Sequence, residues 1–323
     1  MKRTLSVLAG SAALALALTA CSNGSNDGAA SKSDSGLDIV KVGLFPSSAV
    51  GAFQIGIDQG FFAEQGIEIE LVMGQSSAAQ LPAVNSGSLD FILASPTTPL
   101  VASSKGLDVP IVSGYAKNRP GTLGDSVAVL VGSGSDIKSA KDLEGKRVAI
   151  NALGSIGEIG IKEAVAKDGG DPESITFVQL GFDQVAAQLE SGQIDAGMAG
   201  PPFIGQILNN GGAVVSDFIP AAGLDGAELV MVAGRKLIDT KPDLVERFTE
   251  ALDETLTYAE AHQDDVRALL PKVIGTAPEV AAKTEFIQWD AKLDADAIDQ
   301  FSTLLVKYNV MNKEPGENVV WNH

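Results

Sequence analysis

Two short stretches of the chain carry residue types that suit ligand binding. The first, SGSLDFILASPTTP, begins at Ser86, and the second, SGQIDAGMAGPPF, begins 105 residues later at Ser191. Each reads Ser-Gly-x-aliphatic-Asp, then a mostly apolar run, then a small residue and a proline. Ser or Gly followed by Pro favours the start of a helix. The first N–H groups of a helix have no intrahelical partner and attract anions, so each stretch predicts a hydrogen-bonding site for an anionic group.

Three other loops offer the same chemistry. FPSSAVG begins at Phe45, MGQSSAAQ at Met73 and NALGSIGEIG at Asn151, and each places Ser or Gly where a helix-like pattern follows a strand-like one. Together the loops predict a site for a carboxylate, sulfonate, nitrate or phosphate group. Aromatic side chains are candidates for its apolar walls, with plain core packing as the alternative for each: Phe45, Tyr115, Phe182 and Phe203.

The elements that must position these loops alternate between strand and helix. Strand-like runs cover 39–45, 67–73, 90–94 and 109–115, and the runs between them have helical spacing, including one helix expected to continue through Phe61 and Phe62 until Gly66. A second series, with strands at 146–150, 175–181 and 195–200, follows the same order. The pattern predicts two copies of an α/β unit, each with a mainly parallel sheet and with ligands bound at the carboxyl ends of the strands.

The order of the elements also predicts how the chain divides. The runs VAVLV (127–131) and ELVMVAG (228–234) are candidate crossings between the two copies. We therefore expect one lobe from 37–118 plus 228–323 and another from 119–227. The late amphipathic helices are expected to pack back on the first lobe rather than to form a helical domain of their own.

The N-terminus predicts export and anchoring. Lys2 and Arg3 precede the short apolar run from Leu5 to Leu18, and LTAC ends at Cys21. This is the layout of a signal peptide over 1–20, and it resembles a bacterial lipobox, which implies cleavage before Cys21 and lipidation of that residue. Residues 21–36 are polar and predict a flexible tether. The alternatives are an uncleaved anchor or a buried thiol.

Composition and motifs argue against several functions. The formal net charge of −18 disfavours nucleic acid as a partner. Cys21 is the single cysteine, and the two histidines, His262 and His323, are far apart. GSIGEIG has Ile156 where a dinucleotide fingerprint needs its second Gly, and EGKR lacks the features of a phosphate-binding loop. We expect no cofactor, no metal and no catalysis.

The chain from about Val40 to Val310 resembles a family of solute-binding proteins of ABC importers, those for aliphatic sulfonates, taurine, nitrate and the thiamine pyrimidine precursor. The segments that carry the likeness are VKVGLFPSSAVGAFQIGIDQGFFAEQGIEIELV, GSLDFILASPTTPLVASSKG and DPESITFVQLGFDQVAAQLESGQIDAGMAGPPF. The resemblance implies a two-lobed periplasmic-binding-protein fold of type II that closes on its ligand by a hinge. It also implies a monomer, lipid-anchored at the outer face of the cytoplasmic membrane, that delivers a small anion to a permease and its ATPase.

The resemblance also implies which residues face the ligand. From the first lobe they are Phe45, Ser47, Ser48, Gln75, Ser76, Ser95, Pro96 and Thr97, and from the second Gly154, Ser155, Phe182, Asp183, Gly200 and Pro201. One departure is Gly200, because some relatives have an acidic residue there that pairs with a ligand amine, and its absence weakens taurine as the ligand. Glu158 and Asp183 are the other candidate amine partners, or else solvated carboxylates at helix starts.

Three alternative functions stay open at this point. One is a binder of a heterocycle similar to the thiamine pyrimidine. The second is a sensor that presents its ligand to a membrane receptor, which the sequence does not separate from transport. The third, least favoured by the motifs, is an enzyme on the same fold.

Overall fold

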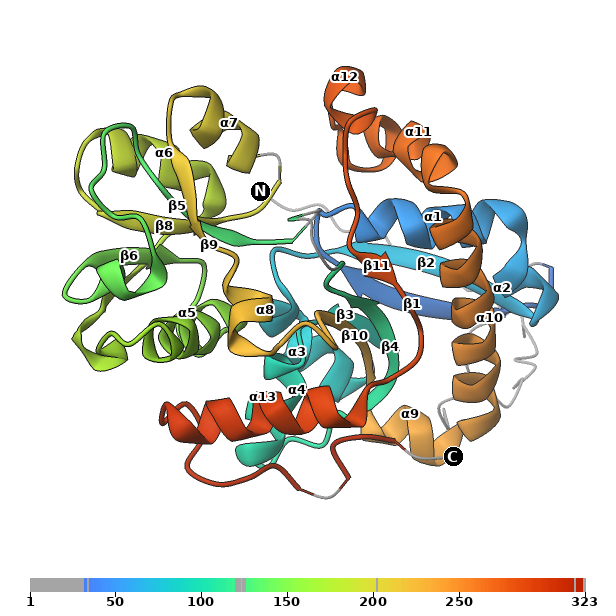
Figure 1. Ribbon diagram of the computed structural model, residues 1–323. Helices are drawn as coiled ribbons and strands as arrows, with labels where there is room; N and C mark the ends of the chain where they lie inside the picture. Colours follow the sequence, from blue (N-terminus) through green and yellow to red (C-terminus); the bar gives the residue numbers. More distant parts are fainter. Residues whose placement is uncertain are drawn as a thin grey trace, which may run out of the picture.

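The computed structural model describes residues 32–33, 35–119, 123, 126–201, 203–316 and 318–321. The expected signal peptide and Cys21 lie outside the described residues. Within them the chain forms two separate sheets with helices packed around each (Figure 1). The predicted α/β class with two mainly parallel sheets is confirmed.

The first sheet has six strands in the order β11-β4-β10-β3-β1-β2. The pairs β1–β2 and β1–β3 are parallel, whereas β10 runs antiparallel between β3 and β4. The strands are β1 Asp38–Leu44, β2 Ile67–Met73, β3 Phe91–Ala94, β4 Ile111–Lys117, β10 Leu229–Ala233 and β11 Gln288–Trp289.

The second sheet has five strands in the order β7-β6-β8-β5-β9. Reading β6, β7, β8, β5 and β9 against β1, β2, β3, β10 and β4 gives the same arrangement, with β5 as the antiparallel strand in place of β10. The sequence repeat therefore corresponds to two sheets of one design. The strands are β5 Ala128–Val131, β6 Arg147–Ile150, β7 Thr176–Gln179, β8 Ala196–Ala199 and β9 Ala213–Ser216.

The two predicted crossings lie at the antiparallel strands. The chain leaves β4 in the first sheet to enter β5 in the second, and it returns from the second sheet into β10 in the first. The two crossings lie side by side, because Asn118 N–H donates to Asp225 O at 3.0 Å and Glu228 N–H donates to Ala116 O at 2.8 Å.

One face of the first sheet is covered by helices that share an apolar core with it. Phe53, Phe91 and Phe248 are fully buried there, and the rings of Phe91 and Phe248 stack with their centroids 3.7 Å apart. The amphipathic helices α10 and α11 thus pack on the first sheet, as expected. The helices are α1 Ala49–Gln59, α2 Phe61–Glu64, α9 Arg235–Thr240, α10 Pro242–Ala261, α11 Gln263–Ile274 and α12 Pro278–Ala281.

The helix expected to continue as far as Gly66 is interrupted. Gly60 has φ +90° and caps α1, its N–H bonding to Gly56 O and Ile57 O, and α2 then covers only four residues. A left-handed residue ends an α-helix, and glycine adopts that conformation without steric cost. Gly66 also has positive φ and precedes β2.

A second core continues from the first sheet into the second. It includes Leu100 from α4, Ile161 from α5 and Phe301 from α13. Helix α13 contacts both α4 and α5, so it bridges the two units rather than lying on the first alone. The remaining helices are α3 Ser77–Ser86, α4 Thr97–Ser104, α5 Ile156–Lys167, α6 Phe182–Glu190, α7 Phe203–Asn209, α8 Phe218–Ala222 and α13 Ala295–Lys307, with short 3₁₀ turns at Ala140–Leu143 and Pro172–Ser174.

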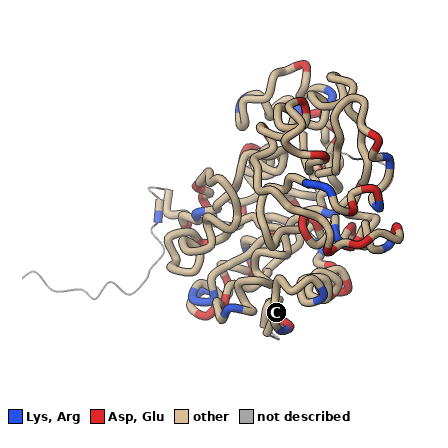
Figure 2. The backbone as a smooth tube through the Cα atoms, turned by 90° about the vertical axis from the view of Figure 1, so that its left-hand side faces the viewer, with Lys and Arg blue, Asp and Glu red and all other residues tan. Residues whose placement is uncertain are grey.

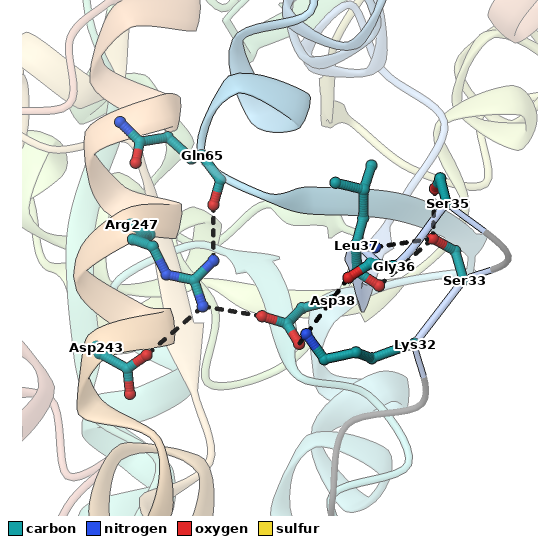
Figure 3. A network of polar contacts seen from close by, with 9 residues as sticks. All are labelled: Lys32, Ser33, Ser35, Gly36, Leu37, Asp38, Gln65, Asp243 and Arg247. Atoms are coloured by element: carbon teal, nitrogen blue, oxygen red, sulfur yellow. Dashed lines mark hydrogen bonds and ion pairs between the residues drawn. The ribbon is translucent and has the colours of Figure 1, made fainter.

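A polar network fixes the start of β1 to helix α10. The Arg247 guanidinium donates to Asp38 Oδ2 at 2.9 Å and to Gln65 O at 2.6 Å, and it lies 3.5 Å from Asp243 (Figure 3). The hydrogen bond from Arg247 holds the pKa of Asp38 below its usual value.

Acidic residues occur on many helices, strands and loops of the described chain rather than on one element (Figure 2).

Among the described residues, no helix combines the length and the apolar character needed to cross a membrane.

The close approach of α1 to α10 makes Gly56 sensitive to substitution. A Cβ at Gly56 would lie 2.0 Å from Thr255 Oγ1, so Gly56→Ala is expected to lower the free energy of unfolding by about 1–3 kcal/mol through overpacking. Gly205→Ala is the matched control, because a Cβ there meets nothing within 4 Å and alanine favours a helix. Urea unfolding of both variants tests this, and a Gly56→Ala protein as stable as the control would contradict it.

Candidate functional site

The repeated Ser-Gly-x-aliphatic-Asp motif has the same structural role in both copies. Asp90 N–H donates to Lys41 O, and Asp90 Oδ2 accepts from Lys41 N–H at 2.8 Å. Asp195 makes the same pair of bonds with Arg147, again with 2.8 Å from the amide to Oδ2. Asp90 therefore holds β3 beside β1, and Asp195 holds β8 beside β6. The glycines of the motif, at 87 and 192, both have the positive φ expected at a helix end.

The two aspartates differ in their electrostatics. Burial raises the pKa of Asp90, whereas the side-chain hydrogen bond from Arg147 lowers the pKa of Asp195. The Arg147 side chain reaches both oxygens of Asp195 at 3.2 and 3.0 Å. The second copy thus adds an ion pair to the backbone clamp that both copies share.

At the far end of the motif the two copies diverge. In the first, Pro96 already has helical dihedral angles, Thr98 N–H donates to Ser95 O, and the half-exposed Ser95 accepts from the buried Thr97 hydroxyl at 3.3 Å. In the second, α7 covers Phe203–Asn209, and Gly200 O accepts from Phe203 N–H at 2.9 Å and from Ile204 N–H at 3.3 Å. The turn that leads into α7 therefore begins at Gly200, and Pro201 is exposed whereas Pro96 is buried.

The start of α1 presents a buried hydroxyl without a partner. Ser48 is 4% exposed and precedes α1, and its Oγ has no hydrogen-bond partner among the described residues. Its neighbour Ser47 donates to Phe45 O at 3.4 Å, and both Ser47 and Phe45 are half-buried. At this helix start the N–H groups of Val50 and Gly51 already donate to Ser47 O and Ser48 O, so the buried Ser48 hydroxyl is the group that a ligand oxygen can satisfy.

Tyr115 positions this helix start and is not a wall of the site in this structure. Its ring is fully buried and stacks with Phe53 at 6.4 Å between centroids. The hydroxyl donates to Ala49 O, in the first turn of α1, at 2.6 Å, and burial raises the pKa of Tyr115. The sequence expectation of an aromatic wall is therefore replaced by core packing that supports the loop.

The second unit presents the equivalent hydroxyl at the start of α5. Ser155 precedes α5, and its Oγ is also buried and unpartnered. Gly154 has φ +72° and its N–H donates to Glu158 Oε2 at 2.7 Å. Glu158 lies 3.9 Å from Lys162, so this carboxylate is already engaged by the protein and is not a free amine partner.

Gln80, which the sequence did not single out, links the strand ends from which two loops of the first unit begin. Gln80 of α3 is buried, and its Nε2 donates to Leu44 O at 3.4 Å and to Val72 O at 3.1 Å, at the ends of β1 and β2. Its Oε1 has no partner. The feature of the sequence that relates to this contact is a glycine near each strand end, Gly43 and Gly74. A Cβ at either position would come within 3.0 Å of the Gln80 side chain, so only glycine leaves room for it.

The loops of each unit are brought together, but the units do not bond to one another through them. Ser77 and Thr98 share a hydrogen bond of 3.0 Å, which joins the starts of α3 and α4. In the second unit the Phe182 ring and Val127 lie beside Gly200, 3.5 and 3.2 Å from where its Cβ would be. Among the described residues, no hydrogen bond joins an expected ligand residue of one unit to one of the other.

Besides Pro201, three expected site residues are exposed to solvent. Gln75 and Ser76 precede α3, where Ser76 Oγ caps the helix by accepting from Ala79 N–H at 3.3 Å, and Asp183 lies in the first turn of α6. Phe203 is half-buried at the start of α7. Two surface cavities, of about 390 and 460 Å³, lie elsewhere and are lined by none of the expected ligand residues.

In the described part of the chain, no group of three or more His, Cys, Asp or Glu side chains is arranged to hold a metal ion.

The sequence matches the family model described as NMT1/THI5 like over residues 49–266. A formylaminopyrimidine-binding protein of Halalkalibacterium halodurans is 24% identical over 250 residues, covering 72% of this chain and 73% of the relative. A Bacillus subtilis protein that carries the name of an aliphatic sulfonates-binding protein is 25% identical over 208 residues, covering 64% of this chain and 60% of the relative.

Solved structures share the fold. The alkanesulfonate-binding protein SsuA of Xanthomonas axonopodis pv. citri, bound to MOPS, superposes with a TM-score of 0.70 at 21% identity and covers 88% of this chain and 98% of its own. The similarity confirms the two-lobed architecture expected from the sequence.

The aspartate clamp predicts a pH-dependent contribution to stability. Because the pKa of Asp195 is lowered in the folded protein, its stabilisation is present above the ordinary carboxyl pKa and is lost as pH falls through the folded value. We expect Asp195→Asn to lower the free energy of unfolding by about 1 kcal/mol at pH 7, and the deficit to shrink below about pH 4.

Thermal or urea unfolding from pH 3 to 7 measures this difference. Asp183→Asn is the control, because Asp183 is an exposed carboxylate on the neighbouring helix with no such clamp. A deficit for Asp195→Asn that stays constant across the whole pH range would contradict the assignment.

Proposed function

The chain belongs to the NMT1/THI5-like family, and from that premise we propose that it is the solute-binding component of an ABC importer for a small organic or inorganic anion. The supporting observation is the pair of helix starts, one in each unit, where Ser48 and Ser155 carry buried hydroxyls without partners. Helix N-termini with open N–H groups and free hydroxyls bind carboxylate, sulfonate or phosphate oxygens. We take 37–118 plus 228–323 and 119–227 as the two lobes.

Closure by a hinge supplies the mechanism. A ligand that bonds to Ser48 in one lobe and Ser155 in the other gains both sets of contacts only when the lobes approach. The ligand therefore shifts the population toward the closed form. Phe45 and Phe182, both half-buried near these loops, would supply apolar contacts to the carbon part of the ligand.

The ligand class follows from the polar groups on offer. Glu158 is bonded to Gly154 and position 200 is glycine, so of the candidate amine partners in the second lobe only Asp183, exposed in the first turn of α6, is left. We favour a sulfonate or nitrate-like anion over an aminosulfonate such as taurine. The Bacillus subtilis relative bears a name of the same class.

A pyrimidine-like heterocycle is the second candidate. The Gln80 Oε1 acceptor has no partner, and the Halalkalibacterium halodurans relative is named for formylaminopyrimidine. A ring N–H or an exocyclic amine could donate to that oxygen. Presentation of the ligand to a receptor instead of a permease would use the same site.

Catalysis is the least supported alternative. Its motivation is the fold alone. The carboxylate beside Ser155, Glu158, is already bonded to Gly154 N–H, and the described residues contain no group of side chains arranged to hold a metal ion.

Export and lipidation at Cys21, with the protein held at the outer face of the cytoplasmic membrane, complete the proposal. Labelling by a lipid precursor, lost in Cys21→Ala, tests that part.

Ligand binding is tested by a thermal-shift panel of alkanesulfonates, taurine, nitrate and aminopyrimidines. A ligand at 100 times its Kd should add about 2.7 kcal/mol to the free energy of unfolding, a readily measured rise in Tm. We expect the sulfonates or nitrate to raise Tm and taurine to do so less. Stabilisation by pyrimidines alone would reverse the ligand class, and stabilisation by none would remove it.

The two orphan hydroxyls should each matter to binding. Ser48→Ala and Ser155→Ala are expected to weaken the best ligand of the panel about 5- to 10-fold, the value of one hydrogen bond of about 1 kcal/mol or slightly more. Ser104→Ala is the control, since that hydroxyl bonds to Val101 O at the far end of α4. Calorimetry measures the three Kd values, and unchanged affinity in both variants would place the ligand elsewhere.

A further inference from the structure

A cluster of buried polar side chains lies where the two crossings meet. Ser126, fully buried at the end of the first crossing, donates its hydroxyl to Glu228 Oε1 at 2.8 Å, and Glu228 stands at the end of the second crossing. Asn118 is 4% exposed and close to Glu228, although no hydrogen bond of normal geometry joins the two side chains. Glu228 as a residue is half-buried, and its Oε2 atom is buried without a hydrogen-bond partner among the described residues.

The cluster is tied to the backbone that moves if the lobes rotate. Glu228 N–H donates to Ala116 O and Asn118 N–H donates to Asp225 O. Lobe rotation must change dihedral angles in these crossings. The burial of the Glu228 side chain therefore depends on the angle between the lobes.

The charges around Glu228 do not compensate an ionised carboxylate. Asp217, at the start of α8, has an unpartnered Oδ1 and acts on Glu228 with like charge, and Asp225 acts on Asp217 in the same way. The two basic residues on either side of Asn118 are already paired, Lys117 with Asp290 and Arg119 with Glu260, each at 2.6 Å. Burial, and secondarily Asp217, raise the pKa of Glu228 to about 7, while the hydrogen bond from Ser126 acts in the opposite direction.

We propose that Glu228 is a proton-operated element of the hinge: the neutral carboxylic acid holds the two crossings in the arrangement seen here, and ionisation favours a lobe angle that exposes the side chain to water. This inference rests on the proposed two-lobed binding function. The direction follows from the environment, since a buried acid whose pKa is raised favours its host conformation at low pH and opposes it at high pH.

The test measures the lobe angle without ligand. Spin labels at Lys105→Cys and Ala187→Cys, two exposed positions on different units, are placed in the full chain carrying Cys21→Ser. The distance distribution between them is compared at pH 5.5 and 8.5. We expect the wild-type hinge to shift between these values with a midpoint near pH 7, and Glu228→Gln to keep the low-pH distribution at both.

Two further variants separate the hinge from general effects of charge. Asp239→Asn removes an exposed carboxylate of α9 that does not act on the cluster, and this variant should shift as the wild type does. Ser126→Ala removes the hydrogen bond that favours the ionised form, so its midpoint should move to higher pH. Ser126→Ala keeps the test usable if Glu228→Gln does not fold.

The proposal is overturned if the wild-type distribution is the same at both pH values. It is equally overturned if Glu228→Gln still shifts, or if Ser126→Ala leaves the midpoint in place. Because no ligand is present, a negative result leaves the solute-binding function intact, and a failed ligand panel leaves this test unchanged.

Discussion

The architecture depends on one backbone clamp made twice. Asp90 precedes β3 and Asp195 precedes β8. The carboxylate of each accepts a hydrogen bond from the backbone N–H of a residue in the neighbouring parallel strand, Lys41 of β1 or Arg147 of β6, and the backbone N–H of each aspartate donates to the carbonyl oxygen of that same residue. The clamp sets the register of the central strands, Val42 opposite Phe91 and Val148 opposite Ala196. With the register set, the carboxyl ends of the parallel strands fall on one edge, and the ligand loops follow from that edge.

What the loops offer at that edge differs between the units. The first unit leaves the Ser48 hydroxyl at the start of α1 without a partner among the described residues, while Tyr115 supports the helix from the core and Gln80 links two strand ends. The second unit fills part of its equivalent with its own carboxylate, Glu158. A protein with a large excess of acidic residues can still receive an anion, because the local field comes from a helix end and not from the net charge.

The fold could be predicted from the sequence because it depends on patterns among residues that are close along the chain. Alternating strand and helix runs and the positive-φ glycines at 87 and 192 all depend on neighbours along the chain. The sequence left alternatives open where contacts distant in sequence decide. For Tyr115 both a wall of the site and core packing were possible, and the structure has core packing, because the ring stacks with Phe53. Gln80 and Glu228 carried no motif, since their roles come from the strands and crossings brought beside them.

Strand β10 gives the chain an order of assembly. The second sheet is drawn entirely from 128–216, whereas the first sheet needs β10 at 229–233 inserted between β3 and β4, which precede it by more than a hundred residues. A chain emerging N-terminus first therefore holds an unfinished sheet, with the edges of β3 and β4 unpaired, until the whole of the second unit has followed. The later-synthesised unit therefore has all the strands of its sheet before the earlier one does. During that interval those open strand edges are the part of the molecule most exposed to mispairing.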